Sequence, residues 1–197
     1  MDYDELCKMT YMTACKYLID KYGQPGRNYF NEKWIKQKIT RTSEGLYCHH
    51  VFENQYLKLS DVDYAKKAPI EAQHKENLLY CNAIEHLILH LIIHRENFNM
   101  SSGGIIFTLC ECNSLYDDKG GKIQWRQSCF KAIQDYYDDY INLIVNNYCA
   151  IKLIFKNNPA SSFYLGNITD LIAVKELSIN PKVSIKVLND FKSRLSN

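Results

Sequence analysis

Histidines are confined to one window of the chain, and this confinement constrains the fold more than any other feature. The sequence holds six histidines in 197 residues, and all lie between positions 49 and 94. His86 and His90 are four residues apart, so on a helix they lie one turn apart on one face and can bind the same ion. His49 and His50 are adjacent, and successive side chains of a strand point to opposite faces. One of this pair can therefore bind metal while its neighbour faces solvent and substrate.

The segments around these histidines are predicted to form two short strands and one buried helix. Residues 46–52 are aromatic and β-branched in part, which favours a strand ending at the paired histidines, and residues 78–81 favour a second strand. Residues 85–95 carry six leucines and isoleucines among three histidines, which predicts a helix buried on most faces. The polar connection between the strands is too long for a hairpin turn. A small helix over residues 60–67, capped by Ser60, could fill it.

The rest of the chain is predicted to be mostly helical. The predicted helices cover residues 4–22, 31–38 (capped by Asn31, with Trp34 facing inward), 122–155 as one or two helices, 169–177 and 181–195; residues 101–104 are predicted to be a loop and residues 105–110 a strand. With 46% hydrophobic residues the chain can bury a real core. The predicted fold class is α+β, with a strand–strand–helix unit embedded in a mostly α-helical chain. We divide the sequence into a basic helical segment (1–42), the histidine-bearing core (43–98) and a mainly helical region (99–197) that packs on that core.

The order of these residues resembles the HNH nuclease motif of the ββα-metal family. The residues that carry the likeness are His49, His50, Asn77, His86 and His90. Asn77 lies nine residues before His86 and thirteen before His90, as in the histidine-rich branch that includes the colicin nuclease domains. The resemblance covers residues 44–93, roughly a quarter of the chain. The connection between His50 and Asn77 is longer than in compact members of the family.

The resemblance implies a division of roles. His49, His86 and His90 would hold one divalent ion, His50 would take a proton from the attacking water, and Asn77 would fix the loop that orients His50. A near-neutral pKa makes imidazole a usable base, and a divalent ion stabilises the charge that develops on a phosphodiester. Neutral imidazoles favour Zn, Ni, Co or Mn, whereas Mg would need phosphate and waters to complete its shell.

A few other side chains are weaker candidates for metal binding. Glu53 and Glu85 lie near the histidines in sequence and could support the ligands or add to them. Cys48 and Cys81 lack the second cysteine of a Cys-x-x-Cys pair, so no structural zinc is predicted. The two remaining histidines are expected to be ordinary core groups.

Basic residues gather in the first part of the chain. Between positions 8 and 41 the sequence has eight lysines and arginines against two acidic residues. This excess is either a phosphate-binding surface or a solvated helix face, and charge alone does not decide between them. The candidate DNA-binding residues are Arg27, Lys36, Lys38 and Arg41.

The sequence also indicates where the protein is expected to be found in the cell. The sequence has no run of about 20 apolar residues and no signal-peptide pattern at its acidic start, so a cytoplasmic protein with reduced thiols and no membrane contact is expected.

The predicted function is a metal-dependent endonuclease acting on double-stranded DNA, of a restriction or defence type, with a homodimer as an open alternative. A mobile-element endonuclease and a toxin effector fit the same features. The alternative from another class is a non-catalytic, metal-stabilised DNA-binding or structural module. Hydrolysis of some other ester has no feature in its favour beyond the ion.

Overall fold

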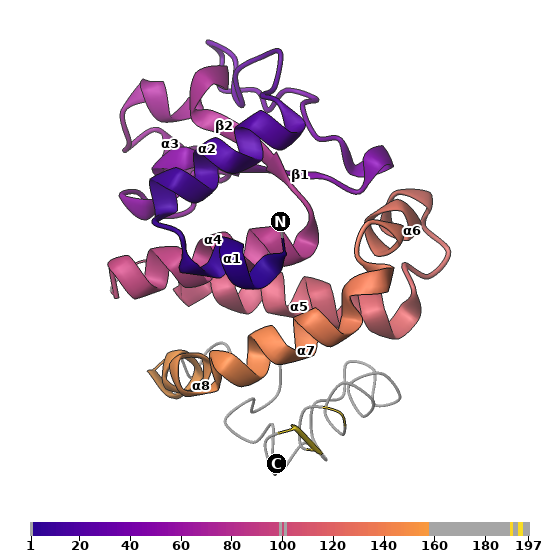
Figure 1. Ribbon diagram of the computed structural model, residues 1–197. Helices are drawn as coiled ribbons and strands as arrows, with labels where there is room; N and C mark the ends of the chain where they lie inside the picture. The colour runs from indigo at the N-terminus through magenta and orange to yellow at the C-terminus, as the bar shows by residue number, and fades with distance from the viewer. Residues whose placement is uncertain (1, 99, 101, 158–189, 191–192, 195–197) are drawn as a thin grey trace.

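The computed structural model describes residues 2–98, 100, 102–157, 190 and 193–194. This part of the chain is mostly helical and carries a small two-stranded antiparallel sheet. Figure 1 shows the sheet with α2 and α3 at one end of the molecule, α1, α4 and α5 in the middle, and α7 and α8 at the other end. The helices are α1 (Tyr3–Lys8), α2 (Tyr11–Tyr22), α3 (Val62–Ala65), α4 (Ala83–Glu96), α5 (Ser102–Asp118), α6 (Gln124–Lys131), α7 (Tyr137–Asn146) and α8 (Tyr148–Asn157), and the strands are β1 (Tyr47–His50) and β2 (Leu78–Cys81).

The helix predicted over residues 4–22 is two helices. The chain leaves the helical conformation at Met9 and begins α2 with Thr10 as the N-cap, whose hydroxyl accepts the backbone N–H of Thr13 at 3.3 Å. Threonine is a favoured cap because its hydroxyl satisfies one of the free N–H groups at a helix start. The break places Tyr11, the first residue of α2, fully inside the core.

Residues 31–38 form a turn, and the helix predicted there is wrong. The Oδ1 atom of Asn31 accepts two backbone N–H groups of the turn, at 3.0 and 2.9 Å. Asparagine that bonds the backbone in this way competes with helix formation. Phe30 and Lys36 then pair as an isolated antiparallel bridge. Trp34 has a left-handed φ of 58°, which a right-handed helix does not allow.

Both strands and the long buried helix are confirmed. β1 pairs antiparallel with β2, and His49 lies opposite Leu79 in the register. α4 follows β2 after a single residue, Asn82, which forms a capping box with Glu85: each side chain accepts the other's backbone N–H, at 2.9 and 2.8 Å. Such a cap is worth about 1 kcal/mol. Eleven of the fourteen residues of α4 are buried, so the helix lies at the centre of the molecule.

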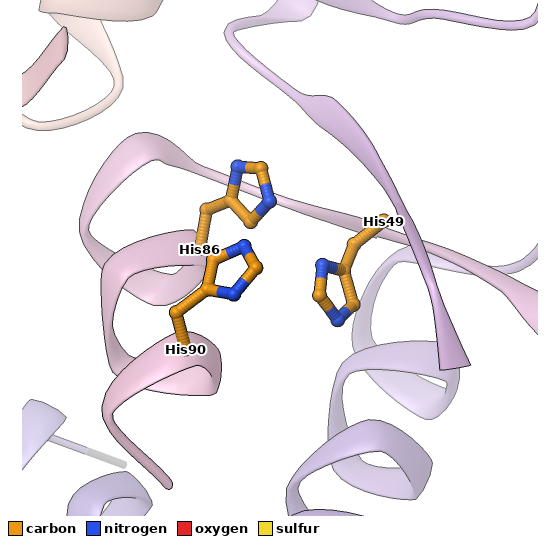
Figure 2. A group of neighbouring side chains, drawn as sticks. All are labelled: His49, His86 and His90. Atoms are coloured by element: carbon orange, nitrogen blue, oxygen red, sulfur yellow. The ribbon is translucent and has the colours of Figure 1, made fainter. Parts of the chain in front are cut away.

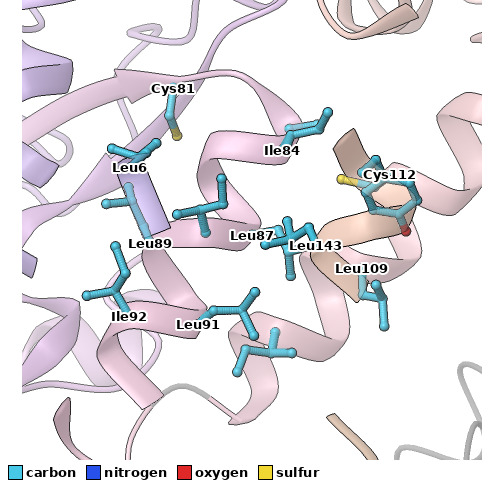
Figure 3. Close-up of a cluster of buried hydrophobic side chains, with 14 of the residues drawn as sticks. Leu6, Cys81, Ile84, Leu87, Leu89, Leu91, Ile92, Leu109, Cys112 and Leu143 are labelled. Atoms are coloured by element: carbon cyan, nitrogen blue, oxygen red, sulfur yellow. The ribbon is translucent and has the colours of Figure 1, made fainter. Parts of the chain in front are cut away.

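The loop and strand predicted over residues 101–110 are wrong from Ser102 onward, because α5 covers residues 102–110, while residue 101 lies outside the described residues. Its apolar residues Ile105, Leu109 and Cys112 are spaced three and four apart, and all are buried in the same core cluster as α4. Figure 3 shows Leu109 and Cys112 facing the α4 side chains Ile84, Leu87 and Leu91. This spacing is helical, and the two glycines before it do not interrupt it.

The remaining described elements agree with the prediction in outline. The helical pattern over residues 122–155 becomes α6, α7 and α8. α3 is shorter than the helix predicted over 60–67, and its cap is Asp61 rather than Ser60. The helices predicted over 169–177 and 181–195 lie outside the described residues, apart from three positions.

One hydrophobic cluster joins the three segments into which the sequence was divided. It contains Leu18 from α2, Ile88 from α4 and Ile144 from α7. Within the described ranges, every helix is too short or too polar to cross a membrane. The cysteines at positions 7, 15, 48, 81, 110, 112, 129 and 149 are free thiols.

Candidate metal centre

Three histidines from two elements converge on one point. β1 supplies His49, and α4 supplies His86 and His90 one turn apart. Each offers a ring nitrogen, and these atoms all lie within 4.8 Å of one another. Figure 2 shows the His49 ring facing the two α4 rings across a shared space. His49 and His90 are buried and His86 is half-buried. The group could hold a metal ion, as the sequence predicted.

Tyr11 positions the His49 ring. Its hydroxyl lies 3.2 Å from the carbonyl of His50 and 2.8 Å from Nε2 of His49. When the hydroxyl hydrogen is on the His50 carbonyl, the oxygen accepts Nε2–H from His49, and the lone pair of His49 is on Nδ1. That atom is buried and has no hydrogen-bond partner. A buried nitrogen with a free lone pair is costly unless something binds it, and a metal ion would do so.

The site favours neutral imidazole. Burial lowers the pKa of His49 to about 3, with further lowering from His90 and His50 and opposition from Glu53. Burial, with His90 and His49 adding to it, holds the pKa of His86 well below its usual range, and burial also lowers the pKa of His90. Metal binding requires unprotonated imidazole, so these ligands are ready to bind at neutral pH.

Glu53 faces the same histidines from the 3₁₀ turn Val51–Asn54, directly after β1. Its Oε2 atom lies 3.6 Å from Nδ1 of His49 and 3.5 Å from Nε2 of His90. Its Oε1 atom lies 3.4 Å from Nδ1 of His50. Burial alone would raise the pKa of Glu53, but the three histidines lower it below the usual range.

His50 is buried, which corrects the expectation that it faces solvent. Its side chain is 1% exposed and its ring is 4.4 Å from the ring of Tyr29, centroid to centroid. Its Nε2 atom lies 3.2 Å from Oε1 of Gln73, whose Nε2 donates to the carbonyl of Leu59. That second bond fixes the amide orientation, so His50 donates Nε2–H to Gln73. Its other nitrogen, Nδ1, points to Glu53 on the side of the metal ligands.

Asn77 lies just before β2 and affects the His50 ring indirectly, through the segment that carries Gln73. Its Nδ2 atom donates to the carbonyl of Glu71 at 2.8 Å. Glu71 belongs to the 3₁₀ turn Ile70–Gln73, the segment that ends with Gln73. Asn77 therefore fastens the segment that holds His50.

Gly104 of α5 forms the wall behind His90. A Cβ atom at this position would overlap the Nδ1, Cε1 and Cγ atoms of the His90 ring, whereas a Cβ atom at Gly103 would meet nothing within 4 Å. α5 can therefore approach α4 closely only because residue 104 has no side chain. The orientation of His90 depends on this contact.

The candidate DNA-binding residues differ in their surroundings. Arg27 and Lys38 are exposed. Lys36 places its ammonium 4.7 Å from the centre of the Tyr29 ring, the same ring that lies against His50. Arg41 forms an ion pair with Glu44 and donates to the carbonyl of Tyr22, so its guanidinium already has partners.

The other candidate ligands lie elsewhere. Glu85 is buried, but its carboxylate accepts from Lys21 at 2.7 Å, from Tyr22 at 3.1 Å and from the backbone of Asn82. It serves the start of α4 and not the histidine group. Cys48 and Cys81 are free thiols that do not belong to a metal-ligand cluster among the described residues.

Sequence reasoning missed the groups that orient the histidines. Tyr11 and Gln73 are 38 and 23 residues from their histidine partners, and nothing in the local sequence marks them. The paired glycines at 103 and 104 were visible but were interpreted as a loop. Comparisons of the chain with protein-family models, with curated proteins and with solved structures give no significant match.

Proposed function

We propose that the protein is a metal-dependent endonuclease that hydrolyses DNA phosphodiester bonds, with β1, β2 and α4 as a ββα-metal core. The observation that carries this proposal is the convergence of His49 from the first strand with His86 and His90 from the helix after the second strand. β1 and α4 supply the histidines in the order that the HNH resemblance implies, with β2 between them, and His50 lies beside them at the end of β1.

The metal would be one divalent ion held by His49, His86 and His90, and it would polarise the scissile phosphate and stabilise the departing oxygen. The free lone pair on His49 Nδ1 fits such an ion. Zn, Ni and Mn suit three imidazoles, and Mg remains a candidate where phosphate and water complete its shell.

His50 is the proposed general base, and its geometry specifies which nitrogen acts. Its Nε2 atom lies against Gln73, so Nδ1, 3.4 Å from Oε1 of Glu53, is the nitrogen on the side of the candidate metal ligands and the one proposed to accept the proton. Gln73 holds the ring in this orientation, and Asn77 holds the segment that carries Gln73. A base must reach the proton it accepts, so the orientation of His50 matters as much as its pKa.

Lys36 is the basic residue best placed to contact a phosphate near the site. Its ammonium lies 4.7 Å from the centre of the Tyr29 ring, and the ring of His50 lies 4.4 Å from the same centre. Arg27 and Lys38 are exposed and can add sequence-independent contacts to the backbone of double-stranded DNA. A restriction or defence nuclease, acting as a monomer or homodimer, is the role we assign to this combination.

A metal-stabilised module without catalysis is the second candidate, and the burial of His50 favours it. At 1% exposure the ring cannot meet a water molecule unless the site opens. In this alternative the ion joins β1 to α4 and the protein binds DNA without cutting it.

Plasmid cleavage after chelation tests the proposal. Supercoiled plasmid is incubated with the chelated protein and then with added Mg, Mn, Ni or Zn. Nicked or linear products that depend on an added ion are expected. Intact plasmid with every ion, in a protein shown to have bound metal, would contradict the nuclease and leave the structural module.

A further inference from the structure

Glu53 has the position of a metal ligand. β1 ends at His50, and the 3₁₀ turn that follows brings the carboxylate of Glu53 beside His49, His50 and His90. One oxygen, Oε2, faces two of the three candidate ligands, His49 at 3.6 Å and His90 at 3.5 Å. The other, Oε1, faces His50 at 3.4 Å.

The distances around Oε2 fit a shared ion better than direct hydrogen bonds. Hydrogen bonds between nitrogen and oxygen are about 2.7 to 3.2 Å long, so both contacts are too long for one. Two ligand atoms that each lie about 2.1 Å from one tetrahedral ion are about 3.4 Å apart. The separations of Oε2 from the nitrogens of His49 and His90 are close to that value.

The charge around Glu53 points the same way. The side chain is only 19% exposed, and its ion-pair contacts in the described chain are all with histidines, none with a lysine or arginine. A largely buried carboxylate is unfavourable unless a cation or strong donors satisfy it. Nδ1 of His49, directly opposite, also has no hydrogen-bond partner. One cation between the two would satisfy both atoms.

We propose that Glu53 is the fourth protein ligand of the ion held by His49, His86 and His90, and that its second oxygen connects this site to His50. Three imidazole nitrogens and one carboxylate oxygen favour a first-row transition ion such as Zn, Co or Mn over Mg. The inference rests on the metal site of the proposed function and does not require that the protein cut DNA. Four protein ligands fill a tetrahedral shell, so a phosphate reaches this ion only when the shell expands or Glu53 leaves it.

Binding of Zn and Co to the chelated full-length protein tests this ligand. Affinity is measured by competition with a chromophoric chelator, and the visible absorption of bound Co reports the ligand set. The variant is Glu53→Gln, which keeps the shape and removes the charge. The control is Glu76→Gln, because Glu76 is 64% exposed and its described ion-pair partner is the neighbouring Lys75.

Glu53→Gln is expected to weaken Zn and Co binding at least about tenfold and to shift the Co absorption, while Glu76→Gln matches the parent protein. Equal affinity and an unchanged Co spectrum in Glu53→Gln would overturn the proposal. If that variant does not fold, Glu53→Asp decides instead, because it keeps the charge but shortens the reach by one methylene, and weaker binding is again expected. Neither readout involves cleavage, so loss of metal binding here and absence of nuclease activity remain separate results.

Discussion

The hydroxyl of Tyr11 lies 2.8 Å from Nε2 of His49 and 3.2 Å from the carbonyl of the next residue, His50. This contact links the first residue of α2 to the end of β1. It turns the other nitrogen of His49 toward His86 and His90, and it does so inside the core, where Tyr11 is fully buried. The candidate metal centre therefore depends on a helix that supplies none of its candidate ligands.

Removing this hydroxyl is expected to weaken the metal site. In Tyr11→Phe the ring still fills the core, but Nε2 of His49 loses its hydrogen-bond partner. Loss of such a supporting contact typically lowers metal affinity about 10- to 100-fold. The measurement is Zn affinity by chelator competition. Tyr17→Phe, on the same helix, is the control and should bind Zn as the parent protein does; equal affinity in both variants would contradict the role assigned to Tyr11.

Two neighbouring glycines should respond differently to the same substitution. Alanine is favoured over glycine inside a helix by about 0.5 to 1 kcal/mol, so Gly103→Ala should be neutral or stabilising. Gly104→Ala should displace the ring of His90, because its Cβ would overlap that ring. We expect Gly104→Ala to lose metal affinity and Gly103→Ala to keep it, as measured by Zn titration. Matching behaviour of the two variants would mean that α5 does not position His90.

Metal is expected to stabilise the folded chain. A ligand that binds only the folded state adds about 2.7 kcal/mol to the free energy of unfolding at 100 times its dissociation constant. Zn added to chelated protein should therefore raise the melting temperature in a concentration-dependent way. His86→Ala should remove this response, whereas His74→Ala, which changes a histidine outside the ligand group, should keep it. A melting temperature indifferent to Zn, Co, Ni and Mn would rule out a metal centre.

Acid is expected to destabilise the metal-free protein. In the unfolded chain the pKa of His49 is about 6.5, whereas burial in the folded chain lowers this pKa to about 3. Above the unfolded value neither state binds the proton, and stability does not depend on it. As pH falls below that value, the unfolded chain takes up a proton that the folded chain excludes, and the free energy of unfolding drops by about 1.4 kcal/mol per pH unit for each such group. His86 shifts in the same direction.

Urea unfolding with chelator present, between about pH 7.5 and 5.5, measures this dependence. Stability should fall across the range and fall less in His49→Gln. A stability that is flat or that rises toward acid would contradict the burial of neutral histidines at this site.

The parts of the fold that the sequence predicted correctly are those where local pattern and packing agree. The run of leucine and isoleucine in α4 needs burial on most sides. The two short apolar segments beside it, residues 46–52 and 78–81, have the composition of strands. The spacing of His86 and His90 predicted their shared face for the same reason. Predicting these features requires only the periods with which side chains repeat along a helix and along a strand.

The errors arose where a contact distant in sequence, or a side-chain bond to the backbone, decided the outcome. Asn31 bonds the backbone of its own turn and prevents the predicted helix. Glycine at position 104 indicated a loop, but the residue lies within α5, where a larger side chain would overlap the ring of His90. The burial of His50 depends on Gln73, 23 residues away, which no period in the sequence reveals.

The most direct test of the nuclease proposal is DNA cleavage by His50→Ala with its metal content measured in the same sample. The proposal predicts that the parent protein and His74→Ala nick or linearise plasmid with an added divalent ion. His50→Ala should bind the same amount of metal and lose about 10²- to 10⁴-fold in rate, the usual contribution of a general base. Cleavage by His50→Ala at the parental rate would contradict His50 as the base. Absence of cleavage by the metal-loaded parent protein would contradict the nuclease itself.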